Sequence, residues 1–390
     1  MMFELSREHE EFRRSVREFA EAEIAPYAAQ WDREHHFPVD VVQQMGKLGL
    51  FGLTAPEEYG GAGDEGDFTS LCVAIEELGR VDQSMGITLQ AGVGLGINPL
   101  VNFGTKEQQE TWLPALVSGE KLAGFGLTEP GAGSDAGATR TKAELVGDEW
   151  VVNGSKQFIT NSGSDITSLV TVTARTGTRE DGRPEISAIM LPTGTPGFVA
   201  EKAYDKLGWH ASDTHPLSFT DVHVPADHLL GERGRGYAQF LATLDDGRVA
   251  ISALSVGCIQ ACLDMSVAYA GERQTFGGPI GRKQGVAFQI ADLQVMLEAS
   301  RMLTYKAAAL KDAGAPYQDF KQAASIAKVY STESAVTATR IATQVFGGYG
   351  FMEEYPVARF YRDAKVLEVG EGTSEVQRML IARGLGLPVE

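Results

Sequence analysis

The sequence predicts an α+β multidomain fold in which two helical domains enclose a central antiparallel β domain. Apolar residues recur at helical spacing near both ends of the chain, whereas the stretch between them alternates apolar and polar residues at the period of a strand. With 390 residues, the chain is long enough for two or three packed domains. We therefore divide it into an N-terminal α-helical domain (1–121), a middle β domain (122–232) and a C-terminal four-helix bundle (233–390).

Local signals bound the helices of the N-terminal part. Ser6 is a candidate N-cap for a helix with apolar residues at helical spacing, and Pro26 closes that helix. Thr105 and Gln108 form a capping box at the start of another helix. A long apolar run extends from residue 85 to 101, but polar residues and glycines interrupt it. Because a bilayer span requires about 20 apolar residues, we expect no membrane segment there.

Strand and turn signals mark the middle part. Residues 143–146 and 149–152, with Gly147-Asp148 between them, predict a β-hairpin, and Asn153-Gly154 predicts a second turn. Further strands are predicted at 169–174, 186–191 and 217–224. The chain then becomes helical again, as is typical of a helix bundle. The expected helices cover residues 237–271, 284–313, 317–346 and 373–383.

The composition argues against several classes of protein. The formal net charge of −18 argues against a nucleic-acid partner, which requires a concentrated basic surface. Three cysteines are too few for a disulfide framework, and the seven histidines show no metal-ligand spacing. The first residues, Met1 to Leu5, lack the basic and apolar regions of a signal peptide. We expect a cytoplasmic protein without a metal ion, a membrane anchor or bound nucleic acid.

The stretch from Val369 to Arg378 is the strongest candidate for a catalytic element. Glu371 lies between two glycines, and Thr373 and Ser374 follow as candidate starts of a helix. The glycines let the backbone turn sharply and let a second molecule approach closely. A carboxylate held in this way is a candidate general base if a desolvated pocket raises its pKa. The alternative is an acid that favours the positive N-terminal end of a helix.

Three further stretches combine residue types that suit ligand binding, and each also has an ordinary structural explanation. The stretch 125–135 offers small residues and hydroxyl groups as a cradle for a polar ligand, or is a mobile loop. The stretch 157–161 contains an aromatic residue that flanks a ring system or belongs to the strand core. In 245–248, Arg248 lies in an apolar helix and requires either an anionic ligand or a neighbouring Asp as its partner.

Two more stretches lie where helices end in glycines. Residues 272–280, followed by Gln284, include Arg273, which is suited to bidentate binding of pyrophosphate. The alternative for Arg273 is a cation at the C-terminal end of a helix. Residues 344–350 let the backbone approach a ligand, but a glycine-rich ending is also common to ordinary helices.

Taken in this order, the stretches resemble the acyl-CoA dehydrogenase family, and the resemblance covers essentially the whole chain. The family has the same helix–sheet–helix organisation as the periodicity predicts. The matching sequences are Leu127-Thr128-Glu129-Pro130-Gly131-Ala132-Gly133-Ser134-Asp135, Glu272-Arg273-Gln274-Thr275-Phe276-Gly277, Gln344-Val345-Phe346-Gly347-Gly348-Tyr349-Gly350 and Glu371-Gly372-Thr373-Ser374-Glu375-Val376-Gln377-Arg378.

The resemblance implies that the ligand of these stretches is FAD. It implies one set of FAD contacts within the chain and a second set to the FAD of a neighbouring subunit, hence a dimer and usually a homotetramer. The first set is Phe125, Leu127, Thr128, Gly133, Ser134, Phe158, Ile159, Thr160, Thr373 and Glu375. The second set is Arg273, Phe276, Gln284, Gln344, Val345, Gly347 and Gly348. The acyl-CoA contacts that it implies are Ser134, Tyr237, Asp245, Arg248 and Gly372.

The reaction that the resemblance implies is the α,β-dehydrogenation of an acyl-CoA thioester to a trans-2-enoyl-CoA. Glu371 abstracts the α-proton, the β-hydride passes to flavin N5, and an electron-transfer flavoprotein takes the electrons. The backbone N–H of the base and the flavin ribityl chain stabilise the developing enolate oxygen. Some members of the family draw their base from the position of Gly247, and since Gly247 cannot serve, Glu371 is the remaining candidate.

The sequence departs from the family pattern at two positions. Gly370 stands where many relatives have Tyr, and Phe158 stands where the family often has Trp. The alternative function is a flavin oxidase of the same fold that uses O2 directly on an acyl-CoA. Oxidation of a nitroalkane is disfavoured because that reaction uses an Asp base in this fold. A flavin- or CoA-binding scaffold without activity is the non-enzymatic alternative.

Glycines in the apolar run bear on the acyl chain that the resemblance implies. Gly92, Gly94 and Gly96 lie in a predicted helix, where each costs about 1 kcal/mol relative to alanine. They serve either close helix packing or space beside the acyl chain. The second explanation, together with the missing Tyr at Gly370, favours medium-length, branched or ring-bearing acyl groups over butyryl-CoA.

Overall fold

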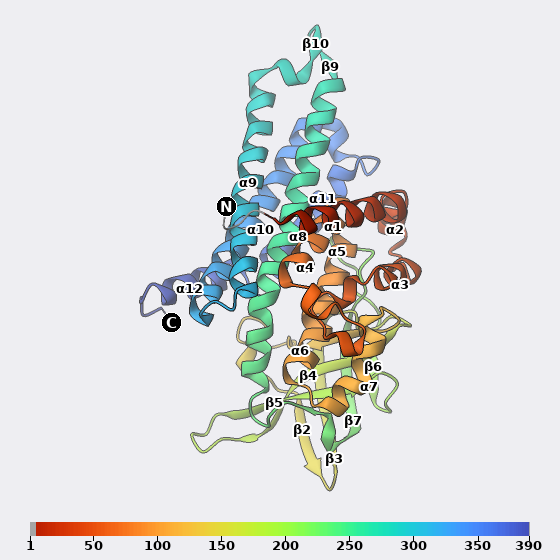
Figure 1. Cartoon of the computed structure of the whole chain (residues 1–390), viewed down its shortest axis with the longest axis vertical. Helices are drawn as coiled ribbons and strands as arrows, with labels where there is room; N and C mark the ends of the chain where they lie inside the picture. The colour runs from red at the N-terminus through yellow and green to blue at the C-terminus, as the bar shows by residue number, and fades with distance from the viewer. Residues whose placement is uncertain (1–4, 390) are drawn as a thin grey trace.

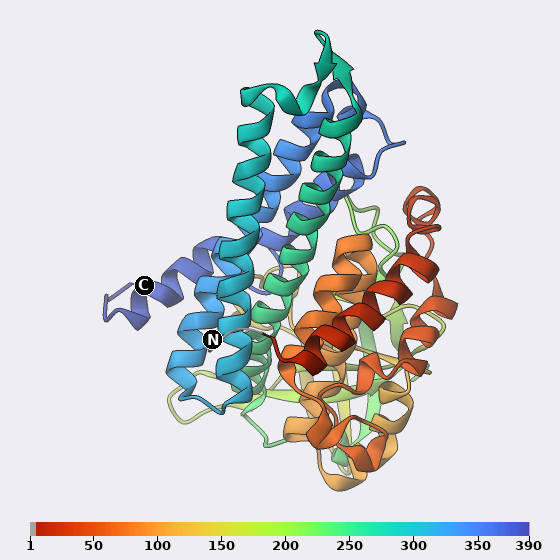
Figure 2. The same ribbon diagram turned by 45° about the horizontal axis from the view of Figure 1, so that its top comes forward.

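Three regions follow one another along the chain and pack side by side. The computed structural model describes residues 5–389, so residues 1–4 of the stretch considered for a signal peptide lie outside it. Figure 1 shows a long helix bundle with the N-terminal helices beside it and the sheet at one end. The view of Figure 2 shows the same N-terminal helices along the flank of the bundle. The tip of the bundle, with β9 (Gln274–Thr275) and β10 (Gly278–Pro279), stands at the end opposite the sheet.

The N-terminal region is helical, as predicted. Ser6 caps the first helix through a capping box with His9, and Thr105 caps the last one through a capping box with Gln108, which confirms both predicted starts. The helices are α1 (Arg7–Phe19), α2 (Ala28–Glu34), α3 (Val39–Lys47), α4 (Phe68–Val81), α5 (Gln83–Gln90), α6 (Asn98–Phe103) and α7 (Lys106–Val117).

The apolar run 85–101 forms α5, a π-helical segment (Ala91–Ile97) and α6. Two of its glycines are required by close packing. A side chain at Gly92 would meet the Phe51 ring, and one at Gly96 would meet the carbonyl oxygen of Ala123 on the first strand. At these two positions the structure supports close helix packing, which is one of the two explanations that the sequence leaves open, because neighbouring atoms already fill the space.

The middle region is an eight-stranded sheet with the order β6-β7-β3-β2-β4-β5-β8 and with β1 paired to β4. Its neighbours are mostly antiparallel, as expected, while β1 and β2 run parallel to β4. The strands are β1 (Leu122–Gly126), β2 (Lys142–Val146), β3 (Glu149–Thr160), β4 (Thr167–Thr178), β5 (Pro184–Pro192), β6 (Phe198–Ala200), β7 (Thr214–Pro225) and β8 (Leu229–Leu230).

The predicted hairpin at Gly147-Asp148 is confirmed, with Val146 paired to Glu149 across the turn. The second predicted turn, at Asn153-Gly154, is wrong. These two residues lie inside β3, where the pairing with β7 shifts register between Val152 and Gly154. The strand therefore continues through a bulge, for which glycine is well suited. No room for a side chain remains at Gly154, because Thr141 packs against it.

The C-terminal region contains the predicted bundle. The helices are α8 (Gly236–Glu272), α9 (Gln284–Asp312), α10 (Tyr317–Phe346), α11 (Pro356–Ala364) and α12 (Ser374–Gly384). By length and composition α8 could cross a membrane, but 83% of its most apolar window is buried inside the protein. Its apolar character is therefore explained by its place in the middle of the bundle. One hydrophobic core joins the N-terminal helices to the bundle, and a second core fills the sheet.

Candidate active site

Glu371 occupies a strained turn immediately before α12. Its φ of 54° lies in the left-handed region, which is uncommon for a residue with a side chain, and Gly372 follows with a φ of 96°. Thr373 caps α12, because its hydroxyl accepts a hydrogen bond from the Val376 N–H. The turn thus presents Glu371 ahead of the helix, as the sequence predicts. Backbone strain of this kind is often held at functional sites.

The carboxylate of Glu371 faces α8 at Gly247. A Cβ added to Gly247 would overlap Oε2 of Glu371, so only glycine leaves room for the carboxylate here. The residue as a whole is half-buried, but Oε2 is out of contact with solvent and has no hydrogen-bond partner among residues 5–389. Gln90 on α5 is fully buried nearby, and its side-chain amide also lacks a partner within the same residues. Unpaired buried polar atoms are rare and point to a ligand or to reactive chemistry.

Burial raises the pKa of Glu371 to about 7. Three groups from three different helices oppose this shift, namely Lys328 on α10, Arg248 on α8 and the Gln90 amide on α5. A carboxylate with a pKa near neutrality is both ionised and basic under physiological conditions, as a general base requires. The condition set by the sequence, a desolvated pocket around Glu371, is met.

Two long side chains hold the Glu371-Gly372 turn. Lys328 Nζ donates a hydrogen bond of 2.7 Å to the carbonyl oxygen of Gly372, and Gln377 Nε2 donates one of 3.0 Å to the same atom. The backbone N–H of Glu371 makes no hydrogen bond to any described residue of the chain. This N–H is therefore free to donate to an oxygen of a bound molecule.

Asp245 and Arg248 on α8 were both expected to contact the substrate, and the structure pairs them with each other. They form a buried ion pair, and the Tyr317 hydroxyl on α10 donates a second hydrogen bond to Asp245. Asp245 is only 1% exposed, and its contact with acyl-CoA stays a prediction. Arg248 keeps an unpaired Nε within the described chain and contributes a positive charge near Glu371.

The glycine-rich cradle follows β1 and is held by a lysine of β3. Lys156 is fully buried, and its Nζ donates to Glu129 Oε1 at 2.7 Å and to the Leu127 carbonyl at 3.2 Å. The start of the loop is thus anchored to the sheet. A Cβ at Gly131 or Gly133 would meet nothing within 4 Å, so the surface of the cradle is open to a ligand.

The other predicted cradle residues differ in exposure. Phe125 and Leu127 are each 8% exposed, and Phe125 stacks on Phe240 with ring centroids 3.8 Å apart. Ser134 is exposed at the edge of the loop, and Thr128 is half-buried. The loop then turns onto α8, where Tyr237 lies 3.7 Å from the Cβ position of Gly137. Ser134 and Tyr237 therefore lie on neighbouring elements, as their shared predicted role requires.

The predicted flavin neighbours at the end of β3 differ in their exposure to solvent. Phe158 has a φ of 61° and is 62% exposed, because a second register shift between Lys156 and Ile159 turns it out of the sheet. Ile159 points into the core of the sheet and is 3% exposed. The contact of Ile159 with FAD stays a prediction, and its burial in the core leaves the backbone as the part that can make this contact. Thr160 is half-buried at the end of the strand.

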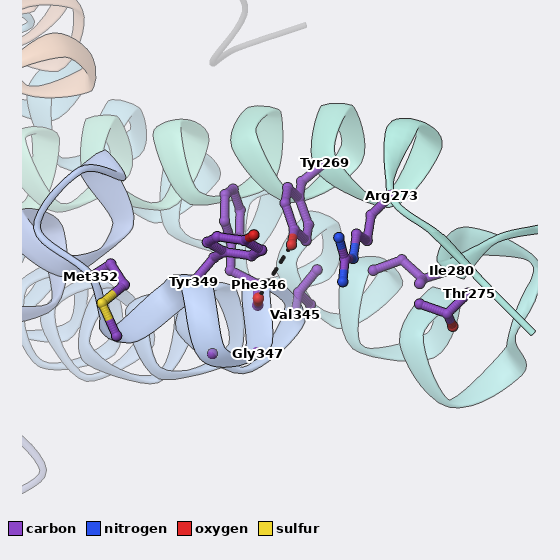
Figure 3. Close-up of a pocket in the computed structure, with 10 residues that line it drawn as sticks. Tyr269, Arg273, Thr275, Ile280, Val345, Phe346, Gly347, Tyr349 and Met352 are labelled. Carbon is purple, nitrogen blue, oxygen red and sulfur yellow. Dashed lines mark hydrogen bonds between the residues drawn. The ribbon is translucent and has the colours of Figure 1, made fainter.

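Several residues of the second predicted set line one cavity at the far end of the bundle. The cavity has a volume of about 540 Å³ and lies between the end of α8 and the end of α10 (Figure 3). Arg273 points into it toward Tyr349, with the guanidinium carbon 5.6 Å from the ring centroid. Val345, Gly347 and Gly348 also line it. Phe276, Gln284 and Gln344 are exposed beside the cavity and do not line it.

The predicted residues are distributed along α8. The cradle packs near its start through Phe125 and Phe240, Glu371 packs against it at Gly247, and the Arg273 cavity lies at its end. Sequence reasoning missed Lys328 and Tyr317, because each lies in an ordinary helical pattern. The one available signal was a charged residue, Lys328, among the small residues of α10.

Comparison with protein families gives three matches that together cover most of the chain. The family model "Acyl-CoA dehydrogenase, N-terminal domain" matches residues 6–120, the middle-domain model matches residues 124–222, and the C-terminal-domain model matches residues 234–386. The three models follow one another along the chain in the same N-terminal, middle and C-terminal order as the predicted domains.

Individual proteins match over nearly the whole length. The chain is 49% identical to "Probable acyl-CoA dehydrogenase YngJ" of Bacillus subtilis, over 99% of this chain and 100% of that protein. The solved structure of butyryl-CoA dehydrogenase from Megasphaera elsdenii has a TM-score of 0.94 and 42% identity, over 99% of this chain and 100% of the other. A chain from a structure of the electron transferring flavoprotein of Acidaminococcus fermentans has a TM-score of 0.94 and 40% identity, over 99% of each chain.

Proposed function

The chain belongs to the acyl-CoA dehydrogenase family and is an FAD-dependent acyl-CoA dehydrogenase, and from this premise we propose that Glu371 is its catalytic base. The observation that carries the proposal is the buried, unpaired Oε2 of Glu371. This atom lies so close to Gly247 that no side chain, and hence no alternative base, fits at that position. In this role Glu371 removes the α-proton of an acyl-CoA thioester.

The surroundings of Glu371 suit that step. Its pKa of about 7 allows it to be ionised and still bind a proton at neutral pH. The free backbone N–H of Glu371 donates a hydrogen bond to the thioester oxygen as negative charge develops there. The closed packing around Oε2 excludes water, which strengthens both interactions. When bound, FAD supplies the acceptor for the β-hydride and so completes formation of the trans-2-enoyl-CoA.

The residues of the cradle fit a flavin cofactor. Open space at Gly131 and Gly133 lets a planar group and its phosphates approach the backbone closely. Thr128, Ser134 and Thr160 offer hydroxyl groups at the rim of this space, and exposed Phe158 offers an aromatic face. Thr373 and Glu375 lie at the start of α12 directly after the base, and we propose that they contact the same flavin.

We propose that the Arg273 cavity binds the diphosphate and adenosine of a neighbouring subunit's FAD. It contains a cation suited to a diphosphate and glycines that permit close approach. It lies at the opposite end of the bundle from the cradle. Large apolar side chains are exposed at the tip and along α9, which favours a subunit interface. Phe276 is 93% exposed, and Phe288, Val295 and Met302 form an exposed row along α9 at intervals of seven residues. This surface supports at least a dimer, and we propose a homotetramer.

An electron-transfer flavoprotein is the proposed electron acceptor. The similarity to a chain in the electron transferring flavoprotein structure supports this partner. The proposed location is the cytoplasm, where the three buried cysteines remain free thiols. A flavin oxidase of the same fold is the competing function, and its signature is rapid reoxidation of the flavin by air.

We propose that the preferred substrate carries a short acyl chain. Gly92 and Gly96 face filled space, so they do not argue for a longer chain. Space does remain at Gly370, where an added Cβ would meet only the Val366 carbonyl at 3.5 Å. The likeness to butyryl-CoA dehydrogenase supports a four-carbon substrate. This replaces the expectation of medium-length, branched or ring-bearing acyl groups.

The substitution Glu371→Gln tests the function directly. It keeps the shape of the side chain and removes its basicity, so FAD should stay bound while anaerobic flavin bleaching by butyryl-CoA slows by at least about 100-fold. Stopped-flow absorbance at the flavin band measures the rate. Bleaching at near the wild-type rate would rule out Glu371 as the base. Rapid return of colour on admitting air to the wild type would favour the oxidase.

A further inference from the structure

Lys328 is a charged side chain in the core of the bundle whose presence the fold alone does not explain. It lies on α10 and is 0% exposed. The residues around it on the same helix are small, and Ala324, Ala327 and Ser331 are all fully buried. From this helix the long side chain reaches the turn before α12, where its Nζ donates to the Gly372 carbonyl. Burying an ammonium group is costly, so its retention there requires a partner or a function.

The ammonium group of Lys328 is incompletely paired. It has three N–H donors, and the described chain gives it one acceptor, the Gly372 carbonyl at 2.7 Å. No carboxylate within residues 5–389 lies close enough for a salt bridge with it. The charged group with the largest influence on it is Glu371, one residue before that carbonyl. Lys328 thus contacts the backbone of the turn and acts on the carboxylate through its charge.

The other charges near this pair come from several elements. Glu371 is influenced by Lys328 and Arg248, and Lys328 is influenced in turn by Glu371, Arg248, Glu368 and Glu333. Arg248 is already neutralised by its ion pair on α8, and Glu333 pairs with a cation on α12. Lys328 is therefore the buried cation in this group without a carboxylate partner of its own.

We infer that Lys328 is a positioning residue for the base. It fixes the strained Glu371-Gly372 turn through the Gly372 carbonyl, and its buried positive charge favours the ionised form of the Glu371 carboxylate. The inference rests on the proposed function of Glu371 and extends it to a residue on another helix. It accounts for a buried lysine that the packing of the bundle does not need.

Lys328→Met tests this inference, because methionine keeps the length and removes both the charge and the donor. Without an opposite charge nearby, Glu371 should ionise at a higher pH, and shifts of about one to three pH units are typical of such a loss. The acid limb of the pH profile of anaerobic flavin reduction should move upward by at least about one unit. Activity at pH 6 should then fall by about tenfold or more. Lys47→Met, on the exposed surface of α3, controls for the change in net charge.

A second readout does not depend on turnover. The infrared difference spectrum between the wild-type flavoprotein and Glu371→Gln isolates the carbonyl band of protonated Glu371. This band should titrate at a higher pH in a Lys328→Met background than in the wild type. Lys328→Arg should keep both the band and the pH profile near the wild-type position. If Lys328→Met does not fold, Lys328→Gln provides the same removal of charge with a smaller loss of hydrogen bonding.

The outcomes separate the two claims. If Glu371→Gln bleaches normally, the assignment of the base fails and the inference fails with it. If Glu371→Gln is inactive but the neutral variants at Lys328 leave both titrations unchanged, the inference fails and the base stands. An upward shift in the neutral variants, absent in Lys328→Arg and Lys47→Met, supports it.

Discussion

At the scale of single residues, the features that suit the Glu371 carboxylate to catalysis also lower the stability of the folded protein. Glu371 is buried with an unpaired oxygen in a backbone conformation that disfavours side chains. Burial raises its pKa from 4.5 to about 7, which means that the folded protein resists the ionised form. The free energy of unfolding is therefore lower at any pH at which the Glu371 carboxylate is charged.

This cost predicts that Glu371→Gln stabilises the protein in a pH-dependent way. Below pH 4.5 the residue is protonated in both the folded and unfolded states, so the substitution should have little effect on stability. Between pH 4.5 and 7 the unfolded state releases its proton first, so wild-type stability falls as the pH rises. Above pH 7 the variant should be more stable by at most about 3 kcal/mol.

Thermal unfolding of the two proteins at pH 4 and pH 8 measures this difference. Glu375→Gln is the matched control, because Glu375 is an exposed acid in the first turn of α12 with a lowered pKa, so removing it should not stabilise the protein. Equal differences in melting temperature at the two pH values would show that the burial of Glu371 carries no cost.

At the scale of elements, a buried ion pair joins the cradle to the sheet. Lys156 on β3 binds both Glu129 and the Leu127 carbonyl, and Glu129 accepts hydrogen bonds from the N–H groups of Arg140 and Thr141. The loop is thus held at both ends by buried side chains. Burial lowers the pKa of Lys156 to about 8, while Glu129 opposes that shift.

Breaking this pair should loosen the cradle. Glu129→Gln leaves a buried ammonium without its counterion, which costs about 3–5 kcal/mol of folding stability. FAD content should fall in parallel, because the loop that contacts it loses its anchor. The double variant Glu129→Leu with Lys156→Met should recover part of the stability, since no buried charge remains.

Urea unfolding and the ratio of flavin to protein absorbance check both effects. Asp181→Asn removes a carboxylate from the exposed Arg183–Asp181 pair in the same domain, and its effect should stay within about 1 kcal/mol. A loss in Glu129→Gln no larger than in this control would mean that the pair does not anchor the loop.

At the scale of the whole molecule, the two parts of the predicted FAD site lie at opposite ends of α8, so under the proposed assembly each serves a different cofactor. The cradle borders the sheet, and the Arg273 cavity is at the tip of the bundle. We expect Arg273→Ala to weaken FAD binding by about 10- to 100-fold, because a diphosphate loses a charged hydrogen-bond donor worth about 1.5–3 kcal/mol.

Equilibrium dialysis of FAD, together with light scattering, measures this effect and the oligomeric state. Arg282→Ala is the control, because Arg282 is exposed at the same tip but does not line the cavity. A monomer that retains stoichiometric FAD would contradict a site shared between subunits.

How far the sequence predicted this structure depended on whether the signal was local. The long helix Tyr317–Phe346 has the predicted bounds, because a proline precedes it and glycines follow it. The Asn153-Gly154 turn failed because the pairing of β3 with β7, distant in sequence, extends the strand through a bulge. Lys328 was missed for a related reason. Its closeness to Gly372 arises only when α10 packs against the turn before α12.

The distance between the cradle and the tip of the bundle also has a genetic consequence. A substitution at Glu371 acts in cis, since it disables the site on its own chain. A substitution at Arg273 acts in trans, since under the proposed assembly it damages the site of the neighbouring chain. Two inactive alleles, one of each kind, would therefore complement each other in a mixed oligomer. The hybrid would contain one site with both an intact base and an intact tip.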